Sequence, residues 1–168
     1  MQTIKNMNNK GFTLIELITS LAILGIIIGI LGNVFLLNLQ SSDYLVSRAD
    51  MAQEMDQIVE SFNQDVHAAS SNGIFPSTGV DNQQLQLKDA SGNLVATYIM
   101  KQNGEFHIVH YYNGNSDDTL ITTNLDYTNS SFNTQSFPIV LTLAFLKNQF
   151  LVNSPVTLTT TTEVYPRN

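Results

Sequence analysis

The sequence predicts an α+β fold, in which one long N-terminal helix packs on a C-terminal antiparallel β-sheet. Three observations lead to this expectation. An uncharged apolar run lies near the N-terminus, a stretch of helical period follows it, and short alternating segments separated by turn residues fill the rest. The chain has 168 residues, which is room for one domain of ordinary size.

The apolar run covers residues 17–42, where 26 consecutive positions carry no charge. About 20 such residues cross a bilayer as a helix, although a buried helix of a soluble core can be equally apolar. Its position favours the membrane, because a basic segment with Lys5 and Lys10 comes directly before it, as in export signals. Basic residues ahead of a span also favour a cytoplasmic N-terminus. We therefore expect a transmembrane helix over residues 12–40 and an exported domain over 41–168.

Beyond the membrane segment, apolar residues recur at steps of three and four. This period near 3.5 predicts an amphipathic helix over residues 43–70, continuous with the membrane helix from Phe12. The expected polar surface includes Glu54 and Asp65, and turn residues end the helix after Ser70. The expected apolar face consists of Leu45, Ala49, Ala52, Met55, Val59, Phe62, Val66 and Ala69.

The remaining segments predict a β-meander over residues 84–165. Two hairpins are expected, a tight one around the Asn-Gly pair at 103–104 and a second around residues 147–149. Pro155 should interrupt the last segment. Residues 113–118 are expected to form a polar loop. A first strand is indicated by Leu85 and Leu87, which alternate with polar residues ahead of a turn at 89–92. The further expected strands are Leu94–Met100, Phe106–Tyr112, Thr119–Leu125, Ile139–Leu146 and Phe150–Thr162.

The composition excludes several classes of function. Charged residues make up only 12% of the chain, and the formal net charge is −7. This balance argues against nucleic acid as a partner, because phosphate contacts need clustered Lys and Arg. The absence of cysteine excludes thiol nucleophiles, disulfides and thiolate metal sites.

The most specific pattern is Lys-Gly-Phe-Thr-Leu-Ile-Glu-Leu at residues 10–17, directly ahead of the apolar run. It resembles the class III signal of type IV pilins and type II secretion pseudopilins. A secretory signal peptide would have a shorter apolar core and a small-residue cleavage site, which this chain lacks. The resemblance implies a pilin-like fold and a leader peptide over residues 1–11.

The resemblance also implies roles for three residues at this junction. Gly11 would precede the bond cut by the prepilin peptidase, and Phe12 would become the N-methylated mature terminus. Glu16 would neutralise the terminal amine of a neighbouring subunit during assembly. A carboxylate at the edge of an apolar span calls for a partner cation, and the helix dipole favours an acid in this first turn. A simpler interpretation is that Glu16 only caps the helix.

Three glycines, Gly25, Gly29 and Gly32, fall at spacings of four and three within the apolar run. Small residues at this spacing allow close approach between membrane helices, whereas ordinary tolerance of glycine in such helices is the simpler interpretation. Many members of the resembled family have a helix-breaking proline where this chain has Asn33.

Other candidate sites are less specific. His107 and His110 are three apart in an expected strand and should point to opposite faces, which favours structural roles over a shared metal. The expected polar loop contains four oxygen-bearing side chains that could suit calcium, although their spacing does not match an EF-hand. These are Asn113, Asn115, Asp117 and Asp118. No cofactor and no catalytic residue is expected.

We therefore expect a minor pilin or pseudopilin, a non-enzymatic subunit that enters or primes a filament for a pilus, competence or type II secretion. The order of elements in the exported domain resembles the J-type minor pseudopilins, the W-type minor pilins and the F-type competence minor pilin. The expected location is the inner membrane, with a single span, and then a surface filament. The implied partners are the prepilin peptidase, other major and minor pilins, the assembly platform and membrane lipid. The alternative is a membrane-tethered exported binding or adhesion domain that does not polymerise.

Overall fold

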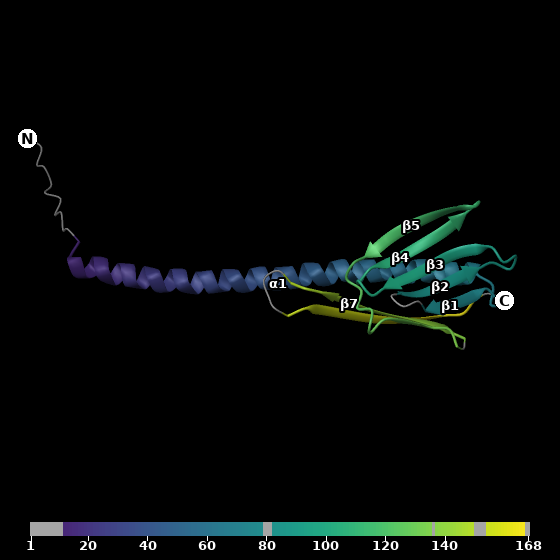
Figure 1. Cartoon of the computed structure of the whole chain (residues 1–168). Helices are drawn as coiled ribbons and strands as arrows, with labels where there is room; N and C mark the ends of the chain where they lie inside the picture. The colour runs from purple at the N-terminus through teal and green to yellow at the C-terminus, as the bar shows by residue number, and fades with distance from the viewer. Residues whose placement is uncertain (1–11, 79–81, 136, 150–153, 167–168) are drawn as a thin grey trace, which may run out of the picture. The chain divides into compact units, whose positions relative to one another are not determined.

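The computed structural model describes residues 12–78, 82–135, 137–149 and 154–166 (Figure 1). The chain forms two compact units, Met1–Ser41 and Ser42–Asn168. The expected leader at residues 1–11 lies outside the described residues. Cleavage at its end, like the membrane and exported assignments, stays a prediction.

Helix α1 runs from Leu14 to Ala68, close to the expected 12–70. Its end is fixed by the following turn, where the Ser70 N–H donates to the Lys88 carbonyl at 2.9 Å and the Lys88 N–H donates to the Gly73 carbonyl at 2.7 Å. A Cβ added to Gly73 would lie 2.2 Å from the Lys88 carbonyl oxygen. Glycine is therefore required for this close approach of two backbone segments.

In the first unit, α1 has no internal partner among the described residues. Every residue from 12 to 39 is exposed, including the large apolar side chains. By its length and composition, α1 can cross a membrane. An apolar surface around the whole circumference of a helix is typical of a membrane or of the core of a larger assembly.

In the second unit, one face of α1 is buried, but its first turns use a different stripe from the expected one. Leu45 and Ala49 are exposed, and Ala52 is half-buried. The expected stripe, with a period near 3.5, drifts around a helix of 3.6 residues per turn, so its early positions leave the buried face. The observed face has steps of four, four, three, four, four and three: Ser47, Met51, Met55, Ile58, Phe62, Val66 and Ala69.

The strands form two antiparallel sheets, where the sequence predicted one meander. The five-stranded sheet has the order β1-β2-β3-β4-β5, and the three-stranded sheet has the order β6-β7-β8. The strands are β1 (Ile74–Thr78), β2 (Asn82–Lys88), β3 (Leu94–Lys101), β4 (Phe106–Tyr112), β5 (Asn115–Thr122), β6 (Ser131–Asn133), β7 (Ile139–Lys147) and β8 (Val156–Val164).

The first expected hairpin is confirmed, because β3 pairs with β4. The second is confirmed only in its strand pairing. Strand β7 pairs with β8, but β7 continues through Lys147, which pairs with Val156, so the expected turn at residues 147–149 is wrong. Strand β8 begins directly after Pro155, whereas residues 150–153 of the expected strand lie outside the described residues. Strands β1 and β6 were not expected. Strand β1 contains Pro76, which lowers its strand propensity, and β6 has only three residues.

The expected polar loop at residues 113–118 is wrong. Asn113 and Gly114 have φ values of 50° and 82°, which form a tight two-residue turn, and β5 begins at Asn115. An Asn-Gly pair with both φ angles positive matches the twist of the flanking strands. The polar residues after the turn therefore continue the ladder against β4 instead of forming a loop.

The buried face of α1 and the inner faces of both sheets form one hydrophobic core. Phe62 is fully buried in this core and packs edge-to-face on Tyr98, with ring centroids 5.5 Å apart. The α+β fold of one long helix packed on antiparallel sheets is thus as expected from the sequence.

Candidate functional site

The start of α1 is closed by a pair of reciprocal hydrogen bonds between Thr13 and Glu16. The Thr13 N–H donates to Glu16 Oε2 at 2.8 Å, and the Glu16 N–H donates to Thr13 Oγ1 at 3.3 Å. The Thr13 hydroxyl also donates to Glu16 Oε2, at 2.9 Å. This is a capping box, in which a Thr and a Glu three residues apart satisfy each other's free backbone N–H groups. The Thr-x-x-Glu pattern is visible in the sequence, but only Glu16 was expected to cap the helix, and the role of Thr13 was not predicted.

The other N-terminal candidates that the structure describes are exposed. Phe12 is 84% exposed. A Cβ added at Gly25, Gly29 or Gly32 would meet nothing within 4 Å. The expected roles of these residues in processing and packing stay predictions, and Gly11 lies outside the described residues.

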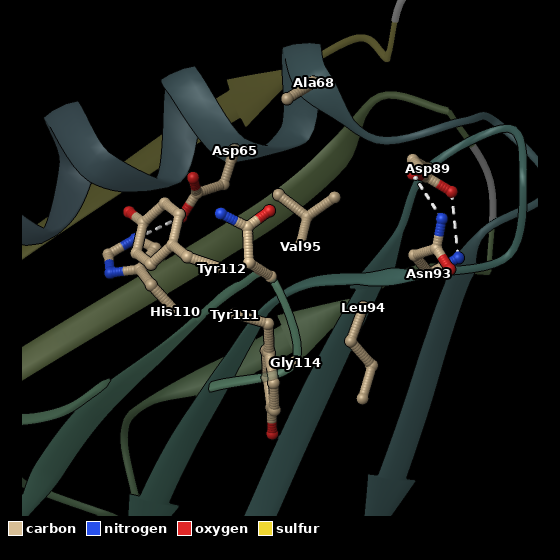
Figure 2. Close-up of a pocket in the computed structure, with 11 residues that line it drawn as sticks. Asp65, Ala68, Asp89, Asn93, Leu94, Val95, His110, Tyr111, Tyr112 and Gly114 are labelled. Atoms are coloured by element: carbon tan, nitrogen blue, oxygen red, sulfur yellow. Dashed lines mark hydrogen bonds and ion pairs between the residues drawn. The ribbon is translucent and has the colours of Figure 1, made fainter. Parts of the chain in front are cut away.

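A second feature is a cavity of about 700 Å³ at the end of α1, between the helix and the tips of β2, β3 and β4 (Figure 2). Its lining residues are Asp65, Ala68, Asp89, Asn93, Leu94, Val95, His110, Tyr111, Tyr112, Asn113 and Gly114. Asp65 was assigned to the polar helix surface from the sequence. Its side chain is in fact only 14% exposed.

Asp65 is held by two partners from the neighbouring strands. The Tyr98 hydroxyl donates to Asp65 Oδ2 at 2.5 Å, and His110 Nε2 lies 3.0 Å from the same oxygen. Burial raises the pKa of Tyr98, and the negative charge of Asp65 raises it further. The phenol therefore stays protonated and acts as a permanent donor that orients the carboxylate.

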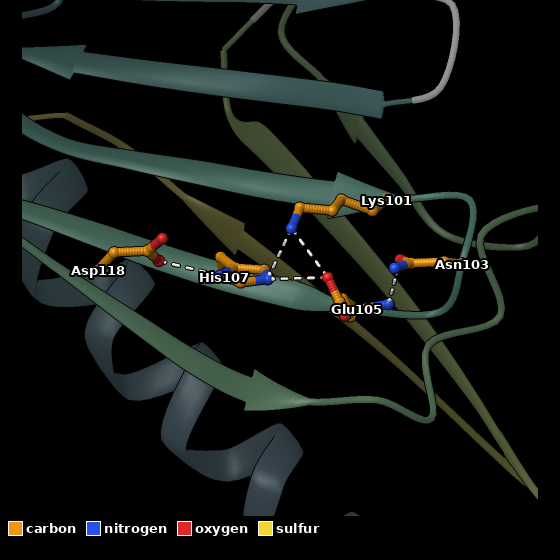
Figure 3. Close-up of polar contacts among 5 residues, drawn as sticks. All are labelled: Lys101, Asn103, Glu105, His107 and Asp118. Carbon is orange, nitrogen blue, oxygen red and sulfur yellow. Dashed lines mark hydrogen bonds and ion pairs between the residues drawn. The ribbon is translucent and has the colours of Figure 1, made fainter.

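A third feature is a polar cluster across β3, β4 and β5, centred on His107 (Figure 3). His107 Nδ1 lies 2.9 Å from Asp118 Oδ1, and its Nε2 lies 3.0 Å from Lys101 Nζ and 3.2 Å from Glu105 Oε2. A hydrogen bond from Lys101, helped by Asn103 and His107, lowers the pKa of Glu105 to about 2.

The two histidines face different partners, as their spacing predicted: His107 joins the cross-strand cluster and His110 contacts Asp65 on α1. In the His107 cluster, the two carboxylates lie at opposite ring nitrogens, so they cannot chelate one ion with that ring. Among the residues that the structure describes, no group of three or more His, Asp or Glu side chains is arranged to hold a metal.

The expected calcium ligands lie in and beside β5. Neighbouring strand residues point to opposite faces, so Asp117 and Asp118 diverge, and Asp118 contacts His107. Calcium binding by Asn113, Asn115, Asp117 and Asp118 stays a prediction that this geometry does not favour.

The α+β fold and the exposed apolar part of α1 define a protein whose N-terminal segment suits a membrane anchor. Residues 6–32 match the family model of the prokaryotic N-terminal methylation motif. The matched segment includes Gly11, Phe12, Glu16 and the three glycines of the apolar run, and it supports a type IV pilin-like protein that is processed as a prepilin. No curated protein and no solved structure matches the chain.

Proposed function

We propose that the chain is a minor pilin or pseudopilin, a structural subunit without catalytic activity that is incorporated into a type IV pilus-like filament or primes its assembly. The observation that carries the proposal is the methylation motif at residues 6–32, followed directly by a helix whose side chains are exposed through residue 39. A helix with this surface needs lipid before assembly and neighbouring subunits after it.

The first test is processing. In cells that contain a prepilin peptidase, the mature chain should begin at methylated Phe12, which removes 11 of 168 residues and leaves 157. Loss of Lys5 and Lys10 changes the formal net charge from −7 to −9. Mass spectrometry of the membrane-bound protein decides this, and an intact Met1 on the incorporated chain would overturn the proposal.

The second test separates the two roles of Glu16. Glutamine also completes a capping box, so Glu16→Gln keeps the helix cap and removes the charge. Thr13→Ala removes the cap's hydroxyl and keeps the charge. If the carboxylate pairs with the terminal amine of a neighbour, Glu16→Gln should reduce crosslinking to co-expressed pilins at least as strongly as Glu16→Ala or Glu16→Val, with cleavage nearly intact.

The Thr13→Ala variant is the matched control and should assemble nearly normally. Loss of crosslinking in Thr13→Ala but not in Glu16→Gln would make the cap the essential feature. Unchanged crosslinking in every variant would reduce Glu16 to a helix-end carboxylate with no role in assembly. Absence of crosslinking in the parent chain itself would favour the alternative, a membrane-tethered binding domain that does not polymerise.

A further inference from the structure

We propose that the cavity beside His110 binds an organic cation, in which an ammonium or a guanidinium group is carried on a flexible aliphatic chain. This binding site belongs to the exported unit and does not depend on filament assembly. Its volume of about 700 Å³ lies within the range of known small-ligand sites, and every lining residue belongs to the same unit.

The charge of the residues that line the cavity favours a positively charged ligand. Among the described residues that line the cavity, the acids are Asp65 and Asp89, and the basic side chain is His110. The lining therefore carries a formal charge of −2 with a neutral imidazole and −1 with a protonated one. An anionic ligand would be repelled in either state, whereas a cation is attracted.

The geometry of Asp65 supplies a defined acceptor. Both hydrogen bonds that the described residues make to this carboxylate end on Oδ2, which leaves Oδ1 as the acceptor for a ligand. Because the side chain is largely removed from water and held from two sides, little reorganisation is needed to bind a cation. An ion pair in such a site is stronger than one on the open surface.

Asp89 provides the second negative charge at the other end of the cavity (Figure 2). Its oxygens accept hydrogen bonds from the Ser91 and Asn93 backbones and from the Asn93 side chain. The bonds from Asn93 lower the pKa of Asp89. The turn therefore fixes a charged carboxylate in position.

The walls between these carboxylates suit the stem of the ligand. Ala68, Leu94 and Val95 contribute aliphatic surface, and the Tyr112 ring lies beside that of His110, with ring centroids 6.0 Å apart. Long cationic side chains pack their methylene groups on such surface, and an aromatic ring attracts the charged head. Tyr112 is 63% exposed, so it is accessible to a ligand.

The experiment titrates the full chain in detergent micelles and follows the NMR signals of His110 and Tyr112. The cationic probes are spermidine, N-acetyl-lysine amide and N-acetyl-arginine amide, and the controls are methyl phosphate and glucose. Saturable shifts are expected with cations alone, and they should weaken as salt is raised. Preference for spermidine would identify a free polyamine as the ligand, and preference for a blocked amino acid would identify a side chain of another protein.

Two variants test the assignment to this cavity. Asp65→Asn should reduce the affinity for the cations at least about tenfold. The matched control is Asp118→Asn, which removes another carboxylate beside a histidine, outside the cavity, and should bind normally. Equal binding by the two variants, saturation with glucose, or no saturation with any cation would overturn the proposal.

A second pair of variants leaves the Asp65 hydrogen bonds intact. Ala68 is exposed in the last turn of α1, where a lysine is favourable for the helix. Ala68→Lys supplies an internal cation and should compete with the probes, reducing their affinity about as much as Asp65→Asn. Ala68→Gln, similar in length but uncharged, should retain most of the binding, and equal losses in both variants would contradict an electrostatic site.

Discussion

The two parts of α1 have the same backbone conformation but opposite environments. Before residue 40 the helix is apolar around its whole circumference and exposed, whereas beyond Ser42 it is amphipathic and buries one face against the sheets. Helix propensity therefore explains neither part. The second part is stabilised by its own chain, and the first must obtain its packing from lipid or from other molecules.

The largest expected effect contrasts two phenylalanines of the same helix. Phe62 is fully buried against Tyr98, and its replacement in Phe62→Ala should destabilise the second unit, residues 42–168, by about 3–5 kcal/mol. Phe35 is 62% exposed, and Phe35→Ala should change that stability by less than about 0.5 kcal/mol. Urea unfolding followed by near-ultraviolet circular dichroism measures both, and similar losses would mean that the two parts share one packed core.

Glycines provide a smaller contrast of the same kind. In Gly73→Ala the new methyl group would meet the Lys88 carbonyl, so the backbone must shift, at a cost of about 1–3 kcal/mol. In Gly29→Ala the new methyl group meets nothing within 4 Å among the described residues, so the stability of the second unit should be unchanged. If Gly29→Ala nevertheless lowers incorporation into filaments, the loss reports contacts between chains. A Gly73→Ala variant as stable as the parent would refute the close approach of the two segments.

The smallest expected effect is a pH dependence of the stability of the second unit. The pKa of Glu105 falls from 4.5 to about 2 in the folded state, so its contribution to stability is present above pH 4.5 and is lost as the pH falls toward 2. Thermal unfolding across this window should therefore show a small decline that is reduced in Glu105→Gln. Identical pH profiles for the parent chain and Glu105→Gln would show that Glu105 does not stabilise the folded state.

Local patterns predicted much of this structure, whereas features that depend on distant residues were missed. The Asn103-Gly104 hairpin and the helical period needed only neighbouring residues. The contact of Asp65 with Tyr98 and His110 joins residues 33 and 45 positions apart, and no spacing rule reports such a pair. The two sheets are separate because the residues between β5 and β6 pair with β7 only at an isolated bridge between Leu125 and Phe145, and no local pattern reports whether two distant strands pair.

At the N-terminal site, the sequence identified the residues but the structure of one chain does not contain their proposed partners. The motif identified Gly11, Phe12 and Glu16 because their positions relative to the apolar run are fixed along the chain. Their proposed partners are other molecules, the peptidase and a neighbouring subunit. The sequence and fold of one chain can therefore locate these residues, but they cannot test the contacts that the residues would make.

The capping box also bears on the shape of the substrate that a prepilin peptidase would receive. Proteases bind extended backbone, and a helix that continued toward the N-terminus would draw the Gly11–Phe12 bond into its first turn. Thr13 and Glu16 stop α1 at Leu14, and Phe12 and Thr13 are not helical. In the proposed pilin, Thr13 and Glu16 thus set the boundary between the leader, which the peptidase would remove, and the helix, which the mature subunit would keep.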